Sequence, residues 1–119
     1  FALMIPKELV AASTRPLLLS LLAEGESYGY ALIEKVRELS DNGIEWTEGM
    51  LYPVLHRLED EGLIESNWRE AESGRRRRYY RLSRTGKSAL REERQQWLTV
   101  HDTLMRVWKR NLGSSWSRS

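Results

Sequence analysis

Four consecutive arginines at positions 75–78 are the side chains in this sequence whose chemistry points most clearly to a binding role. A guanidinium group can grip a phosphate with two parallel hydrogen bonds. From Arg69 to Arg94 there are ten Lys/Arg against four Asp/Glu, a local balance of +6, whereas the remaining residues sum to −4. A basic stripe on an acidic body suits a polyanion such as DNA, because neutralised phosphates release counterions. The alternative is that these arginines only form a solvent-exposed charged face with no binding role.

Other kinds of chemistry find little support in the residue types. The chain has no cysteine and only two histidines, His56 and His101, which fall in separate predicted helices. There is no Gly-rich phosphate loop and no HExxH pattern. We therefore expect no catalytic residues, no metal site and no cofactor, and we reject an enzyme. The longest apolar stretch is too short to span a bilayer and no signal-peptide pattern is found, so we expect a cytoplasmic protein.

Hydrophobic periodicity predicts three helices in the first half of the chain. The first covers 9–22, with a break near Pro16 and a stop at Gly25. The second covers about 28–40, with Ser27 as its cap. The third follows Thr47 as N-cap and ends at Gly62; Pro53 suggests either a bent start or a start near Met50. The core residues predicted for the second and third helices are Leu32, Ile33, Val36, Leu39, Leu51, Val54, Leu55 and Leu58.

The pattern then changes to the alternation of strands. Residues 64–69 and 75–83 alternate around a turn at 71–74, which predicts a hairpin whose buried face holds Ile64, Trp68, Tyr80 and Leu82. A last helix of about 25 residues follows from Thr85, with apolar residues at heptad-like spacing. The predicted fold is therefore α+β and mainly α: a winged helix-turn-helix domain at 5–84, a C-terminal dimerisation helix at 85–112 and a flexible tail at 113–119.

In a winged helix-turn-helix, the second helix of the motif lies in the major groove of DNA. Here that helix is the one after Thr47, and its acidic end at Asp60 and Glu61 would repel phosphate, so we expect only its first half to enter the groove. Arginines at a hairpin tip can reach a flanking phosphate or the minor groove. The predicted DNA-binding residues are Thr47, Tyr52, His56, Arg57, Arg75, Arg76, Arg77 and Arg78.

Several segments together resemble the PadR transcriptional regulators. They are Tyr28-Gly29-Tyr30, the run from Gly49 to Glu59, Glu61-Gly62-Leu63-Ile64, the run from Gly74 to Ser83, and Thr85-Gly86. The resemblance implies a homodimeric winged-helix protein, usually a repressor, that binds a double-stranded DNA operator and dimerises through its C-terminal helix. Met50 departs from the family pattern, which often has a small hydroxyl residue there.

The short C-terminal part is similar to the compact LmrR-like subgroup of that family, whose members bind multidrug-type ligands. That similarity implies a planar aromatic effector in the dimer interface, bound by Trp97, Val100 and Leu104; the alternative is that Trp97 only fills a dimer core. The implied dimer contacts are Leu90, Trp97, Leu104, Val107 and Trp108. A winged-helix adaptor that binds proteins without ligand sensing is the other function considered, and the retained arginines count against it.

Overall fold

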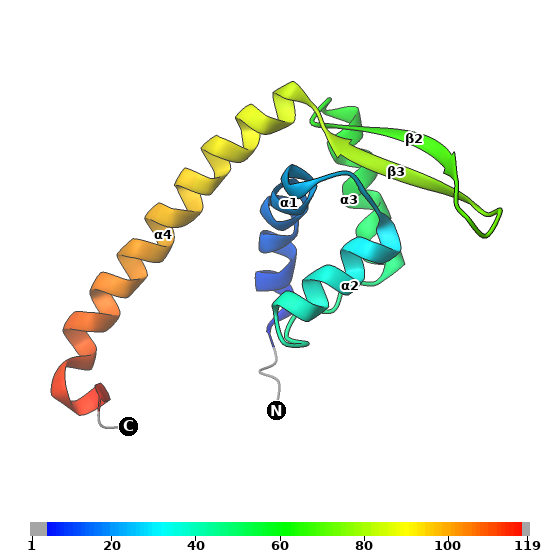
Figure 1. Ribbon diagram of the computed structural model, residues 1–119. Coiled ribbons are helices and arrows are strands. Elements are labelled where there is room, and N and C mark those ends of the chain that lie inside the picture. The colour runs from blue at the N-terminus through cyan, green and yellow to red at the C-terminus, as the bar shows by residue number, and fades with distance from the viewer. Residues whose placement is uncertain (1–4, 118–119) are drawn as a thin grey trace.

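The structure, a computed structural model, describes residues 5–117, with side chains as far as Asn111 (Figure 1). Within these residues, four helices and three short strands follow one another in the order α1 (Lys7–Glu24), β1 (Ser27–Tyr28), α2 (Gly29–Leu39), α3 (Glu48–Asp60), β2 (Ile64–Glu70), β3 (Arg76–Leu82) and α4 (Arg84–Ser117). The fold is therefore mainly helical α+β, as predicted from the sequence. No helix among the described residues is both long and apolar enough to cross a lipid bilayer.

Helix α1 is continuous through Pro16, so the predicted break is wrong. Proline removes one backbone donor, but the helix is stabilised by burying Leu18, Leu19 and Leu22 against the rest of the domain. The neighbouring hydroxyls bond within the helix, Thr14 Oγ1 donating to the carbonyl of Val10 over 2.7 Å. Gly25 lies at the C-terminal end of α1, as expected.

The segment before α2 forms a strand that sequence reasoning missed. Ser27 does not cap the helix; it pairs with Tyr80, and Tyr28 pairs with Tyr79, which adds β1 to the edge of the hairpin. The sheet is thus three-stranded, in the order β1-β3-β2. Leu39, predicted to be in the core, is 65% exposed because it is the last residue of α2 and lies beyond the packed part of the helix.

Helix α3 begins where its cap predicts. Thr47 Oγ1 accepts a hydrogen bond from the backbone N–H of Met50 at 3.2 Å, and the helix is regular from Glu48 onward despite Pro53. Proline frees the carbonyl of Gly49 four residues earlier, and both residues are exposed, so water can satisfy that carbonyl. At the other end Gly62 adopts a left-handed conformation, φ +77°, and stops the helix.

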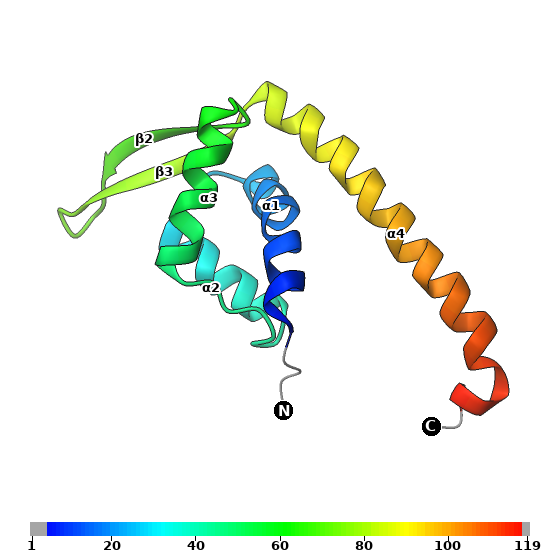
Figure 2. The same cartoon turned by 180° about the vertical axis from the view of Figure 1, so that it is seen from behind.

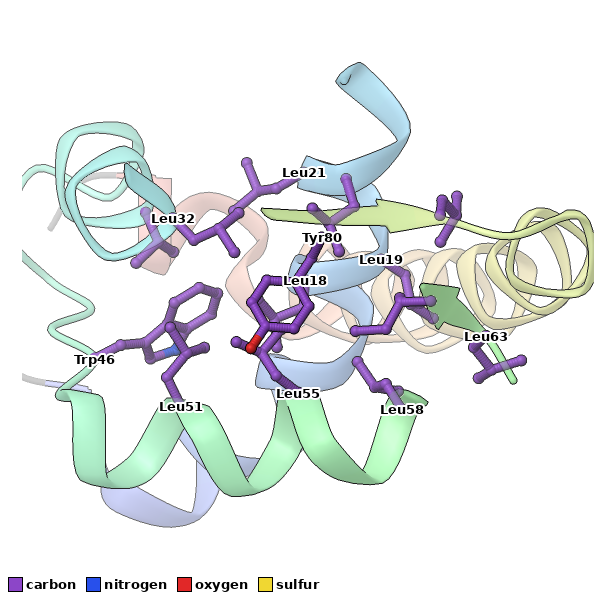
Figure 3. Packing of buried hydrophobic residues seen from close by; sticks show 14 of the residues in the cluster. Leu18, Leu19, Leu21, Leu32, Trp46, Leu51, Leu55, Leu58, Leu63 and Tyr80 are labelled. Atoms are coloured by element: carbon purple, nitrogen blue, oxygen red, sulfur yellow. The ribbon is translucent and has the colours of Figure 1, made fainter. Parts of the chain in front are cut away.

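The core lies between α1, α2, α3 and the base of the sheet (Figure 3). Tyr80 is 1% exposed, and its ring points from β3 toward α3 between Leu18 and Leu55. Trp46, in the connection before α3, closes the core beside Leu51. Val54 is only partly buried at the edge of this cluster. The core thus packs α3 against the strand that continues into the arginine run.

Helix α4 leaves the domain as a long arm on the side opposite the hairpin (Figures 1 and 2). The Cα radius of gyration is 17.1 Å, against about 13.5 Å for a compact chain of this length. The helix begins at Arg84, close to the prediction, but continues to Ser117, beyond the predicted end, so the segment 113–117 is helical here. Residues 118 and 119 of the predicted tail lie outside the described residues.

An ion-pair cluster ties the start of α4 to the domain. The guanidinium of Arg15 in α1 lies 3.0 Å from Glu61 at the end of α3 and 2.8 Å from Glu93 in α4. The hydrogen bond from Arg15 lowers the pKa of Glu61, so that carboxylate stays charged near neutral pH. One arginine therefore links three helices where the arm leaves the domain.

Candidate nucleic-acid interface

A groove of about 660 Å³ lies between the first half of α3 and the hairpin of β2 and β3. From α3 it is lined by Glu48, Tyr52 and His56, and from the hairpin by Trp68 and the four arginines 75–78. Tyr28 and Tyr30 extend its wall toward β1 and α2. Most residues predicted to bind DNA therefore meet at one surface. Thr47 is exposed next to it, and Arg57 is exposed on α3 but does not line the groove.

Tyr52 is held at the floor of this groove by a close approach of α2. A Cβ built on Gly29 would lie 2.5 Å from the Tyr52 hydroxyl, so glycine makes room for the phenol. This agrees with a packing role for the Tyr28-Gly29-Tyr30 segment. Burial raises the pKa of Tyr52, and the charge of Glu48 adds to the effect. The phenol is therefore neutral near neutral pH, able to donate a hydrogen bond to a base or phosphate.

Trp68 was predicted to be buried, and this is wrong: it is 53% exposed. It shares the face of Ile64, Tyr80 and Leu82, but the hairpin extends beyond the helices at this point, so the ring meets arginines instead of the core. The guanidinium carbons of Arg76 and Arg78 lie 5.2 and 5.6 Å from its ring centroid. The alternation of side chains along a strand could not show how far along the hairpin the helices pack against its face.

The opposite face of the hairpin carries a second set of arginine–aromatic contacts, of which Tyr28 and Arg77 also line the groove. Arg77 lies 4.4 Å from the ring centroid of Tyr28, and Arg69 lies 4.5 Å from that of Tyr79. Arg69 also pairs with Glu26. The charge of Arg69 is therefore paired, whereas the Tyr28 ring holds Arg77 without neutralising it, since an aromatic face carries no net charge. Sequence reasoning did not find these partners because Tyr28 and Arg77 are far apart along the chain.

Helix α4 presents the residues that were predicted to contact a partner or a ligand. Trp97, Val100, Leu104, Val107 and Trp108 are between 37 and 51% exposed. Leu90 differs, because it is half-buried against the core of its own chain. Further along the same helix, an apolar groove of about 320 Å³ is lined by Met105 and Trp108 together with Arg106 and Lys109.

No group of three or more His, Cys, Asp or Glu side chains within the described residues is placed to hold a metal ion. The histidine at position 101 contacts its neighbour Asp102 at 3.1 Å on the exposed surface of α4.

Helices α2 and α3 followed by the β2–β3 hairpin have the arrangement of a winged helix-turn-helix, a class of DNA-binding fold. The chain belongs to the transcriptional regulator PadR-like family, whose model matches residues 18–92. Regulators of this family bind DNA, and transcriptional regulators are generally not enzymes.

Individual relatives agree with the family model. The chain is 41% identical to the transcriptional regulator Rv3488 of Mycobacterium tuberculosis over 88 residues, 74% of this chain and 78% of that protein. Among solved structures, a transcriptional regulator from Clostridium thermocellum matches with a TM-score of 0.77 at 29% identity, covering 87% of this chain and 97% of the other. A PadR family regulator from Eggerthella lenta gives 0.71 at 37% identity, covering 86 and 87%.

Proposed function

We propose that this protein is a homodimeric repressor that binds an operator through the groove between α3 and the hairpin. The observation that carries the proposal is the meeting of Tyr52, His56 and the four arginines at one surface. The first half of α3 would enter the major groove, with Tyr52 and His56 at base edges and Thr47 and Arg57 near the backbone. Of the hairpin arginines, Arg75, Arg76 and Arg77 would contact flanking phosphates or the minor groove, whereas Arg78 is paired with Glu59.

The dimer would form through α4. Trp97, Val100, Leu104 and Val107 are spaced by three and four residues, which is the a/d spacing of a coiled coil. All four are exposed here, and an apolar patch of this kind on a helix that leaves its domain is typical of an interface. Leu90 would support the base of the arm from within its own chain. Pairing would place two copies of α3 about 34 Å apart, one turn of DNA, on a pseudo-palindromic operator.

Replacing Arg75 and Arg77 together by alanine should weaken binding to operator and random DNA alike. Both side chains lack a carboxylate within 4.0 Å among the described residues, so their charge is free for phosphate. The slope of log K against log salt is negative, and its magnitude should decrease by about 0.9 for each phosphate that the variant no longer neutralises. Fluorescence anisotropy titrations at several salt concentrations measure this slope.

The matched control is Arg81→Ala. Arg81 lies on the same strand but pairs with Glu65 at 3.0 Å and does not line the groove, so the slope should not change. A loss confined to operator DNA would contradict the phosphate role of Arg75 and Arg77. Wild-type binding that ignores salt, or no DNA binding at all, would favour the protein-binding adaptor instead.

A planar aromatic effector is the second part of the proposal. Trp97 offers a partly exposed ring, with Val100 and Leu104 on the same side of α4, and two such helices would enclose a flat molecule between tryptophans. The ligand would act by favouring one spacing of the two α3 helices. It can shift operator affinity only by as much as its own affinity differs between the two dimer geometries.

Trp97→Ala should abolish quenching of protein fluorescence by a planar dye such as ethidium, measured without DNA. The physical reason is loss of the stacking surface. Trp68→Phe is the matched control, because that ring lies on the hairpin, away from α4; quenching should persist in it. Unchanged quenching in Trp97→Ala would overturn the pocket at this position.

A further inference from the structure

The four arginines of the hairpin differ in what holds them. Arg78 Nη2 lies 3.4 Å from one carboxylate oxygen of Glu59 and 3.5 Å from the other. Its Nε is buried without a hydrogen-bond partner, and its guanidinium lies over Trp68. Arg78 is therefore held in place against α3, and the Glu59 carboxylate faces its positive charge.

Glu59 reaches this arginine from α3 and contacts both strands at once. Its side chain is 28% exposed. One of its carboxylate oxygens accepts a hydrogen bond from Ser66 Oγ on β2 at 2.5 Å, and both oxygens face Arg78 on β3. A single carboxylate thus joins α3 to the two strands of the hairpin.

The other three arginines have no such partner. Among the described residues, no carboxylate lies within 4.0 Å of Arg75, Arg76 or Arg77, and Arg76 and Arg77 lie over aromatic rings. Their positive charges are available to a polyanion. The charge of Arg78 is balanced, and a phosphate would have to compete with Glu59 for it.

We propose that Glu59 is a positioning residue that withholds Arg78 from the DNA backbone and sets the position of the hairpin relative to α3. The inference rests on the proposed function, since it concerns how the same groove binds DNA. Phosphate contacts carry affinity without sequence information, so an arginine removed from them lowers binding to operator and random DNA alike. The Glu59–Arg78 contact therefore limits the general attraction of the hairpin to the DNA backbone.

The test compares wild type, Glu59→Gln, Arg78→Gln and the double variant, with Arg76→Gln as the matched control. Anisotropy with a random-sequence duplex is measured at several salt concentrations. Arg76→Gln should reduce the magnitude of the slope of log K against log salt by about 0.9 per protomer, while Arg78→Gln should leave that slope nearly unchanged. Glu59→Gln should steepen the slope by a similar amount and tighten random-sequence binding. In the double variant the slope should return close to the wild-type value.

Two results would overturn the proposal: a loss in Arg78→Gln as large as in Arg76→Gln, or an unchanged slope in Glu59→Gln. Thermal unfolding of wild type, the two single variants and the double variant gives a second readout without DNA. A non-additive effect of the two substitutions supports the Glu59–Arg78 contact, and additivity overturns it. If the four proteins show this coupling but wild type binds no DNA, the proposed function fails and the Glu59–Arg78 contact itself stands.

Discussion

Leu104→Glu is expected to give a monomer and to weaken operator binding by about 10²–10⁴-fold. Leu104 is 43% exposed at the centre of the heptad-spaced residues of α4, where a partner helix would cover it. Two carboxylates facing each other in a dry seam would lose their hydration and repel. The two DNA-binding domains would then bind independently, which removes the gain in affinity that comes from linking two sites. Sedimentation or light scattering measures the mass, and anisotropy measures the binding.

Thr99→Glu is the control for this experiment. Thr99 lies on the same helix and is exposed, its hydroxyl donates only to the carbonyl of Gln95, and it is outside the heptad-spaced set. The substitution adds the same charge, so a loss caused by charge alone would occur in both variants. A Leu104→Glu protein that remains dimeric would place the interface elsewhere on the molecule. Random-sequence DNA binding should persist in the monomer, because the groove lies in the other part of the chain.

Gly86→Ala is expected to destabilise the fold by about 3 kcal/mol, the upper end of the usual range for overpacking. A Cβ at this position would lie 2.0 Å from the carbonyl oxygen of Leu63 and 2.8 Å from a methyl of Leu82. The carbonyl cannot move away easily, since it accepts a hydrogen bond from the backbone N–H of Ser83 at 3.0 Å. Chemical denaturation at one fixed protein concentration measures the change.

Gly49→Ala provides the opposite expectation at a second glycine within a helix. Nothing lies within 4 Å of a Cβ built there, and alanine is favoured over glycine in a helix by about 1 kcal/mol. We therefore expect a neutral or stabilised protein. If Gly86→Ala were equally harmless, the start of α4 would not be packed against Leu63, and the direction in which the arm leaves the domain would not be set by this contact.

The regular elements were largely predictable because local chemistry decides them. Thr47 caps α3, Gly62 ends it and the alternation of residues 64–69 marks a strand, each through interactions with residues nearby in the chain. The arginine run and its place on a hairpin were predicted in the same way. What failed depended on distant partners: Pro16 lies inside a continuous helix, and residues 27–28 form a strand only because β3 is beside them.

The sequence by itself determined the family, the order of the four helices and the positively charged hairpin, since repeating patterns and motifs of neighbouring residues carry that information. Tertiary structure alone decided that Trp68 is exposed and that Arg78 is held by Glu59 while its three neighbours are not. The reason is physical. Four adjacent arginines are chemically identical in a sequence, and they become different only when strand alternation and helix α3 bring separate partners to each.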